Sequence, residues 1–275
     1  MTTREISYGK KRVVFYRLAK RSAPPFAASV TIDVFGERFT AAYTEGDNRE
    51  VVATDTMKNF VYATAGDFTG ASLESYVAFL GQRLLETYPQ MERVRVTAHE
   101  VPMDAAEGAG DGSDVVYRLT RGDVAMAEAS FERHGGTVEI GAFRCGIEGM
   151  RLLKTTGSSF AAFARDAYTT LPELTDRPLT IALDVHWRTE GRDHVDPADV
   201  RRALEATFHD FDSRSIQQLV HEMGVRLLRR FPAISEVGFE GENHTPDAVA
   251  EGKGDVIVFA EPRQTFGKIG LVLRR

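Results

Sequence analysis

The chain has 275 residues, of which 43% are hydrophobic and 27% charged, a composition typical of a globular protein with a sizeable core and a length that favours two domains. The formal net charge of −6 argues against nucleic acid or an anionic membrane as the main partner. The single cysteine, Cys145, excludes an internal disulfide framework and a cysteine-rich zinc site. No apolar run reaches membrane-spanning length, and Met1 to Ile6 lacks the apolar core of a signal peptide, so we expect a cytoplasmic protein.

The first elements in chain order are a predicted β-hairpin and a helix start. Residues 12–18 and 28–43 are rich in β-forming residues and are joined by a turn sequence that contains two prolines. An apolar strand end then runs into the polar sequence Thr54-Asp55-Thr56, which is typical of the start of a helix. Such side chains usually cap helices, and this segment alone favours that function. The unpaired N–H groups of a helix start can also hold an anion or the edge of a heterocycle.

A helix, a strand and a loop are predicted next. An apolar stripe at three- and four-residue spacing predicts the helix, which the sequence Tyr88-Pro89 ends: Leu73, Tyr76, Val77, Leu80 and Leu84. Alternation at residues 94–98 predicts a strand. Residues 101–114, rich in Gly, Asp and Ala, predict an exposed mobile loop, and residues 115–133 return to strand character.

The second half repeats this order. We expect β-rich segments at 136–143 and 150–154 to open it and residues 178–187 to continue it, while Leu153 to Phe160 has the pattern of another polar strand-to-helix junction. A second apolar stripe predicts the last long helix: Ile216, Leu219, Val220, Met223 and Leu227. Phe231-Pro232 ends this helix, and a strand through Val237 and Phe239 follows.

A weak internal repeat relates the two halves. Arg83-Leu84-Leu85, Tyr88-Pro89 and Val94 recur as Arg226-Leu227-Leu228, Phe231-Pro232 and Val237, always 143 positions later. The repeat indicates an α+β protein in which antiparallel strands with helices on one face are built twice, in domains 1–135 and 136–275. Sheet edges of this kind need partners, and oligomerisation into a larger barrel is one way to supply them.

Conventional nucleotide and metal motifs are missing from the sequence. It contains no GxGxxG, P-loop, HExxH or GxSxG, so we expect no nucleotide cofactor. Asp184 with His186, and His209 with Asp212, could each come together in the fold. Neither pair has a third ligand at a recognisable spacing, so we expect no metal site.

Several polar segments, each of which could be an ordinary capping or surface feature, occur together in an order that resembles the urate oxidase (uricase, factor-independent urate hydroxylase) family. The resemblance covers nearly the whole chain. It is strongest in Tyr43-Thr-Glu-Gly-Asp-Asn48 with Val51-Val-Ala-Thr-Asp-Thr-Met-Lys-Asn59, in Phe160 through Leu171, and in Ser215-Ile-Gln217.

The resemblance implies a fold and an activity. The fold is two tandem tunnelling-fold (T-fold) domains whose sheets close into a barrel in a homotetramer, with active sites at subunit interfaces. The activity is oxidation of urate by O2 and water to 5-hydroxyisourate and hydrogen peroxide, with no cofactor and no metal.

The resemblance also implies the site residues. Lys10 and Thr54 are similar to the family's proton-handling dyad, with desolvation favouring a neutral lysine and with His244 assisting the relay. The implied substrate-binding residues offer a stacking ring, a guanidinium fork, amide groups, an O2-holding amide and helix-start backbone N–H groups. They are Thr54, Asp55, Phe160, Arg177, Ile216, Gln217 and Asn243.

One departure from the family pattern concerns Asn243 and His244. The familiar eukaryotic sequence has one residue between this asparagine and histidine, whereas here they are adjacent. Neighbouring side chains of an extended segment point to opposite sides, so Asn243 is the stronger candidate for the site.

Two alternatives remain open at this point. One is a T-fold enzyme acting on pterins, which usually needs a three-histidine zinc site or a differently placed glutamate that we do not find. The other is a purine-binding protein without catalysis, against which the combination of Lys10, Thr54 and Asn243 argues.

Overall fold

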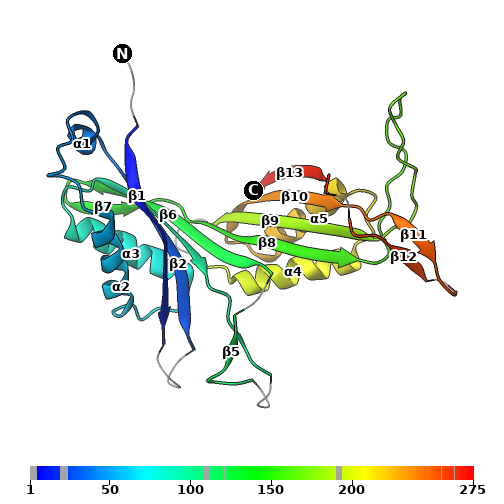
Figure 1. Cartoon of the computed structure of the whole chain (residues 1–275), viewed down its shortest axis with the longest axis horizontal. Helices are drawn as coiled ribbons and strands as arrows, with labels where there is room; N and C mark the ends of the chain where they lie inside the picture. The colour runs from blue at the N-terminus through cyan, green and yellow to red at the C-terminus, as the bar shows by residue number, and fades with distance from the viewer. Residues whose placement is uncertain are drawn as a thin grey trace. The chain divides into compact units, whose positions relative to one another are not determined.

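The computed structural model describes residues 5–18, 24–107, 112–119, 122–189, 194–254, 256–262 and 264–275. The chain divides into two compact units, Met1–Cys145 and Gly146–Arg275. Each unit is built from antiparallel strands with helices packed on the sheet, so the expected α+β class is confirmed (Figure 1).

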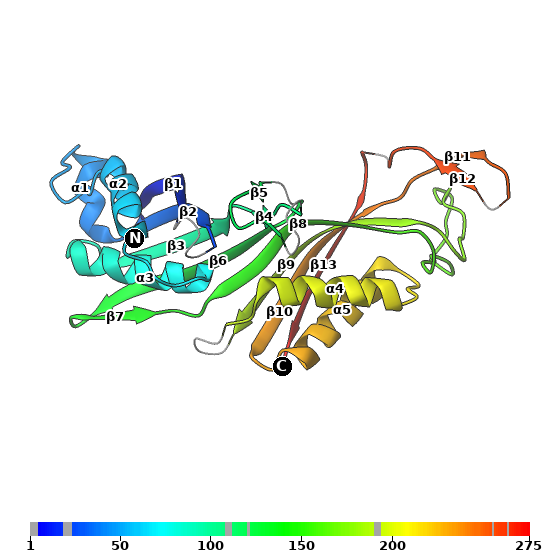
Figure 2. The ribbon, with the colours of Figure 1, turned by 90° about the horizontal axis from the view of Figure 1, so that it is seen from below.

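The first unit contains a sheet in the order β1–β2–β3–β6, with β7 added to β6. Helix α2 contacts β1, and α3 packs on β3 and β6 (Figure 2). The elements are β1 (Ser7–Arg17), β2 (Phe26–Phe35), the 3-10 helix η1 (Glu37–Phe39), α1 (Thr40–Thr44), α2 (Thr54–Ala65), α3 (Leu73–Thr87), β3 (Arg93–Glu100), β4 (Asp104–Ala105), β5 (Tyr117–Arg118), β6 (Val124–His134) and β7 (Thr137–Ile140).

Three parts of the first unit differ from the sequence-based prediction. The strand expected over 28–43 ends at Phe35, because Gly36 adopts φ +152° and the following residues form η1 and α1. The loop expected at 101–114 contains β4, which pairs with β5, while its residues 108–111 lie outside the described residues. Strand β7, expected to open the second half, instead pairs with β6.

The second unit contains strands in the order β8–β9–β10–β13, and a separate hairpin of β11 and β12. Helix α5 packs on β10 and β13, and α4 packs on α5. The elements are β8 (Arg144–Lys154), β9 (Leu179–Thr189), α4 (Pro197–Asp210), α5 (Ile216–Arg230), β10 (Ile234–His244), β11 (Ala248–Glu251), β12 (Ile257–Phe259) and β13 (Gly267–Arg274).

Two features of the second unit were predicted wrongly or missed. The expected helix after Phe160 is not there, because residues 161–178 form turns and irregular backbone in which Ala162 adopts φ +59°. Helix α4 was missed, although Asp196 caps it and Pro197 occupies its first turn, both of which are sequence signals for a helix start.

The internal repeat is confirmed in the helices. Helix α5 begins and ends 143 positions after α3. Each helix is capped by a serine, Ser72 or Ser215, whose hydroxyl accepts a hydrogen bond from the backbone N–H three residues later. The predicted apolar stripes face the sheets, and the buried members include Tyr76, Leu80, Leu219 and Met223.

Among the helices of the described ranges, none has both the length and the apolar character needed to cross a membrane.

Candidate active site

The predicted site residues form two groups, one in each unit. Lys10, Thr54 and Asp55 belong to the first unit. The other six, which come from the loop after β8, the start of α5 and the end of β10, belong to the second: Phe160, Arg177, Ile216, Gln217, Asn243 and His244.

In the first unit, the side chain of Tyr8 ties the strand of Lys10 to the segment that precedes Thr54. The Tyr8 hydroxyl accepts a hydrogen bond from the backbone N–H of Val52, at 3.2 Å. Tyr8 is two residues before Lys10, and Val52 is two residues before Thr54. The register between β1 and β2 shifts just after Lys10, a β-bulge that re-aims side chains of the strand.

The start of α2 has no side-chain cap. The residue at the N-cap position is Ala53, whereas serine or aspartate side chains cap α3, α4 and α5. The Asp55 carboxylate accepts hydrogen bonds from Lys58 and Asn59, and its pKa is lowered first by Lys58 and to a smaller extent by the charge of Lys10. The prediction from this segment alone, that its polar side chains cap the helix, is therefore wrong. The hydroxyl of Thr54 does not cap α2.

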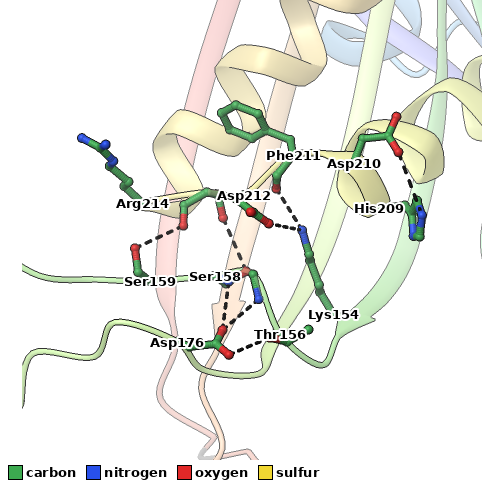
Figure 3. A network of polar contacts seen from close by, with 12 residues as sticks. Lys154, Thr156, Ser158, Ser159, Asp176, His209, Asp210, Phe211, Asp212 and Arg214 are labelled. Carbon is green, nitrogen blue, oxygen red and sulfur yellow. Dashed lines mark hydrogen bonds and ion pairs between the residues drawn. The ribbon is translucent and has the colours of Figure 1, made fainter.

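In the second unit, residues 155–160 form a loop that is hydrogen-bonded to the segment before β9 and to the segment before α5 (Figure 3). Asp176 accepts hydrogen bonds from the Thr156 hydroxyl at 2.6 Å and from the Gly157 N–H at 2.8 Å. These bonds, that of Thr156 first, hold the pKa of the Asp176 carboxyl below its usual range. Ser213 donates its N–H to the Gly157 carbonyl and accepts the N–H of Ser159 at its own carbonyl.

The base of this loop is also fixed. Lys154, at the end of β8, donates to the carbonyl oxygen of Phe211 at 2.9 Å and lies 3.7 Å from the Asp212 carboxylate (Figure 3). The backbone N–H of Arg177 donates to the backbone carbonyl of Ser158 at 2.8 Å. Together these bonds hold Phe160, Arg177 and the first turn of α5 in one arrangement.

Arg177 is a buried cation beside an aromatic ring. The residue is 7% exposed, and its guanidinium carbon lies 5.7 Å from the centroid of the Phe160 ring. Burial lowers the pKa of this guanidinium. No carboxylate of the described residues forms an ion pair with it, and its Nε has no hydrogen-bond partner there. A buried, incompletely paired cation is costly, and a planar anion would supply the missing partner.

The start of α5 and the end of β10 carry the remaining predicted residues of this group. Ile216 and Gln217 are the first residues of α5, with Ile216 buried and Gln217 exposed. At the end of β10, Thr245 accepts a hydrogen bond from Nη1 of Arg177 at 3.1 Å and donates one to Oδ1 of Asn243 at 3.3 Å. Asn243 is therefore connected to Arg177.

His244 makes different contacts. Its Nε2 lies 2.9 Å from a carboxylate oxygen of Glu242, and its ring packs against Phe266 with the centroids 4.8 Å apart. The adjacent side chains Asn243 and His244 thus have different partners, as strand alternation predicts.

Three residues of these groups had no role in the sequence-based prediction: Tyr8, Asp176 and Thr245. The strand alternation that separates Asn243 from His244 could have indicated Thr245, because it is two positions after Asn243. The described part of the chain contains no cluster of three or more His, Cys, Asp or Glu side chains that could hold a metal ion.

Comparison with known proteins identifies the family. The sequence profile of the uricase family matches residues 6–118 and 143–269. The uricase of Haloferax volcanii is 37% identical over 95% of this chain and 96% of its own, and the uricase of Halalkalicoccus jeotgali is 35% identical over 95% of each. The crystal structure of a uricase from Bacillus fastidious superposes with a TM-score of 0.92 at 34% identity, covering 99% of this chain and 94% of its own. The chain, with its polar groups arranged around a buried arginine, is therefore a member of the uricase family.

Proposed function

We propose that this chain oxidises urate with O2 and water to 5-hydroxyisourate and hydrogen peroxide, and that it does so without a metal or an organic cofactor. Membership of the uricase family makes the chain an oxidoreductase that acts on urate. The observation that best supports the proposal is the buried Arg177 guanidinium beside the ring of Phe160, with no carboxylate partner among the described residues.

Urate is a planar anion with hydrogen-bonding groups along its whole edge. Arg177 would form a charge-assisted fork with one edge of it, and Phe160 would stack on its face. The amide of Gln217 would bond the neighbouring edge, and the backbone N–H groups at Ile216, Thr54 and Asp55 would complete the set.

The reaction needs a proton acceptor and a place for O2. The Lys10–Thr54 dyad would remove a proton from bound urate, with the Thr54 hydroxyl as the relay. Two electrons then pass from urate to O2, which leaves as hydrogen peroxide, and water supplies the hydroxyl group that appears on the product. Asn243 and Thr54 would hold O2 and then this water above the ring, and His244 is a further candidate for the proton relay.

We further propose that the two groups of site residues meet between subunits. Each unit would be a T-fold domain, and four chains would form a homotetramer whose sheets close into a barrel. Edge strands β1 and β13 support this, because each pairs on one side only within the described residues and exposes apolar side chains such as Val14, Tyr16 and Val272. The proposed location of this assembly is the cytoplasm.

Two substitutions separate catalysis from binding. Thr54→Ala should remove most urate turnover and leave binding of xanthine, a purine without the 8-oxo group, within about twofold of the parent protein, because the hydroxyl serves the relay. Arg177→Ala should mainly raise KM and the xanthine Kd, by about tenfold or more, because a charge-assisted hydrogen bond is lost.

The matched control for Thr54 is Thr56→Ala, an exposed threonine of the same helical turn that should keep full turnover. Unchanged turnover in Thr54→Ala would refute the dyad. Unchanged KM and xanthine binding in Arg177→Ala would remove Arg177 from the site. Binding of purines by the parent protein without any turnover would favour a binding protein.

A further inference from the structure

We propose that Thr245, rather than His244, connects the end of β10 to the site, as a positioning residue that holds Arg177 and Asn243 in a fixed relation. The inference rests on the proposed roles of Arg177 and Asn243 in binding urate and O2. It adds to them a residue that neither the motif comparison nor the predicted dyad includes.

The hydroxyl of Thr245 is the middle of a directed chain of hydrogen bonds. It accepts from Nη1 of Arg177 at 3.1 Å and donates to Oδ1 of Asn243 at 3.3 Å. A hydroxyl has only one hydrogen, so donating it to Asn243 leaves its lone pairs for the guanidinium. Both bonds can therefore exist together, and the bond from Arg177 links residues 68 positions apart in the chain.

These two hydrogen bonds determine which end of the Asn243 amide is free. Because Oδ1 accepts from Thr245, the amide nitrogen is the group that Asn243 presents to a ligand, and it is a donor. A donor is what O2 needs as it gains electrons and becomes peroxide, since negative charge develops on its oxygens. Without the Thr245 hydroxyl, nothing among the described contacts of Asn243 distinguishes one amide orientation from the other.

The same hydroxyl also supports Arg177. The guanidinium is buried, and its Nε already lacks a partner in the described residues. Removing the Thr245 acceptor would leave Nη1 without its 3.1 Å bond as well, and a buried unpaired donor is costly. The guanidinium would then shift to find another partner, and the fork to the substrate would shift with it.

The contacts of His244 are on the other side of the strand. Its Nε2 lies 2.9 Å from Glu242, its ring packs on Phe266, and its side chain is 12% exposed. Glu242 and His244 share one side of β10 by alternation, whereas Asn243 and Thr245 are joined by a hydrogen bond on the other.

The test compares Thr245→Val, which has nearly the same shape but no hydroxyl, with Thr245→Ser, which keeps the hydroxyl. Steady-state kinetics with varied urate and varied O2 give kcat and the KM of each substrate, and xanthine binding is measured separately. We expect Thr245→Val to raise the xanthine Kd and the KM for O2 by about tenfold each, as for a lost hydrogen bond to a charged or reacting group. Thr245→Ser should keep both the xanthine Kd and the KM for O2 within about twofold of the parent values.

Two comparisons exclude a merely structural effect. Thr180→Val makes the same change at a half-buried threonine of β9 and should leave the KM for O2 as it is. His244→Gln should raise the KM for O2 less than Thr245→Val does. A lower thermal midpoint with unchanged KM for O2 and unchanged xanthine Kd would overturn the inference. Impairment of Thr245→Ser equal to that of Thr245→Val would also overturn it. So would a larger rise in the KM for O2 in His244→Gln than in Thr245→Val. If the parent protein does not oxidise urate, the proposed function fails, while the xanthine measurements still test the link between Thr245 and Arg177.

Discussion

At the scale of single residues, Asp176 is the carboxylate that orders the loop of Phe160. It is next to Arg177 in sequence, and it accepts hydrogen bonds from Thr156 and Gly157 on the other side of the loop. Gly157 adopts φ +76°, a left-handed conformation that suits glycine, so the turn and its carboxylate acceptor belong together. We therefore expect Asp176 to act on the proposed site by fixing the loop.

The pKa of Asp176 gives this role a pH signature. Because the folded-state pKa is lowered, its stabilisation is fully present above the unfolded value of about 4 and is lost as the pH falls through the folded value. We expect Asp176→Asn to lower the thermal midpoint by a constant amount near neutral pH and by progressively less below about pH 4. Thermal melts of both proteins across pH 3 to 8, roughly the range that spans that value, measure this difference. A difference that grows on acidification would contradict the assignment.

At the scale of elements, the bond between Tyr8 and Val52 holds a strand against the start of a helix. Burial raises the pKa of Tyr8, so its hydroxyl is protonated near neutral pH while it accepts the Val52 N–H. The ring of Tyr8 meets Phe39 edge-on with centroids 4.9 Å apart, and this contact would survive loss of the hydroxyl. We infer that the hydroxyl sets the separation of Lys10 and Thr54.

Tyr8→Phe should therefore lower kcat for urate by about tenfold while the KM changes less than threefold, because the dyad would be displaced and the binding group of the second unit would not. Tyr43→Phe is the matched control. It removes a tyrosine hydroxyl that donates to the backbone carbonyl of Ser7, the residue before Tyr8 in β1, and it leaves the hydrogen bond between Tyr8 and Val52 in place. Equal kinetics for Tyr8→Phe and the parent protein would show that this bond is only structural.

The elements also show what could be predicted from the sequence. Helices α3 and α5 were predictable because their apolar stripes are regular and a proline follows each. The irregular segment 161–178 was not, because its hydrogen bonds go to residues 156–160 and to its own turns, partners that no local period indicates. Phe160, Arg177 and Asn243 were inferred one by one from a family resemblance, whereas the hydrogen bond between Arg177 and Thr245 joins distant parts of the chain that no local pattern relates.

At the scale of the whole molecule, the repeat has diverged at its helix starts. Helix α2 begins at Thr54 without a side-chain cap, while α4, 143 positions later, begins at Pro197 under the Asp196 cap. Helices α3 and α5 are both capped, but α5 alone starts beside the loop of Phe160, to which Ser213 is bonded. The two units thus differ at α2 and α5, and the site proposed above would take residues from one unit of each kind.

This division of the proposed site predicts complementation between inactive chains. Thr54→Ala damages only the first-unit group and Arg177→Ala only the second-unit group. When both variants are co-expressed in equal amounts, about a quarter of the sites would combine two intact groups if each site is shared by two subunits of a symmetric oligomer. Activity of the separated hybrids, compared with a mixture of the two purified variants, measures this. Hybrids no more active than that mixture would show that each chain forms its own site.

The most direct test of the central claim follows urate, O2 and hydrogen peroxide together on chelator-treated protein. We predict that urate absorbance falls, that O2 is consumed and that peroxide appears in equal molar amounts, with no added metal or cofactor. Turnover that disappears after chelation and returns with a metal ion would contradict the cofactor-free chemistry. Tight binding of xanthine with no change in urate or O2 would contradict the enzyme itself.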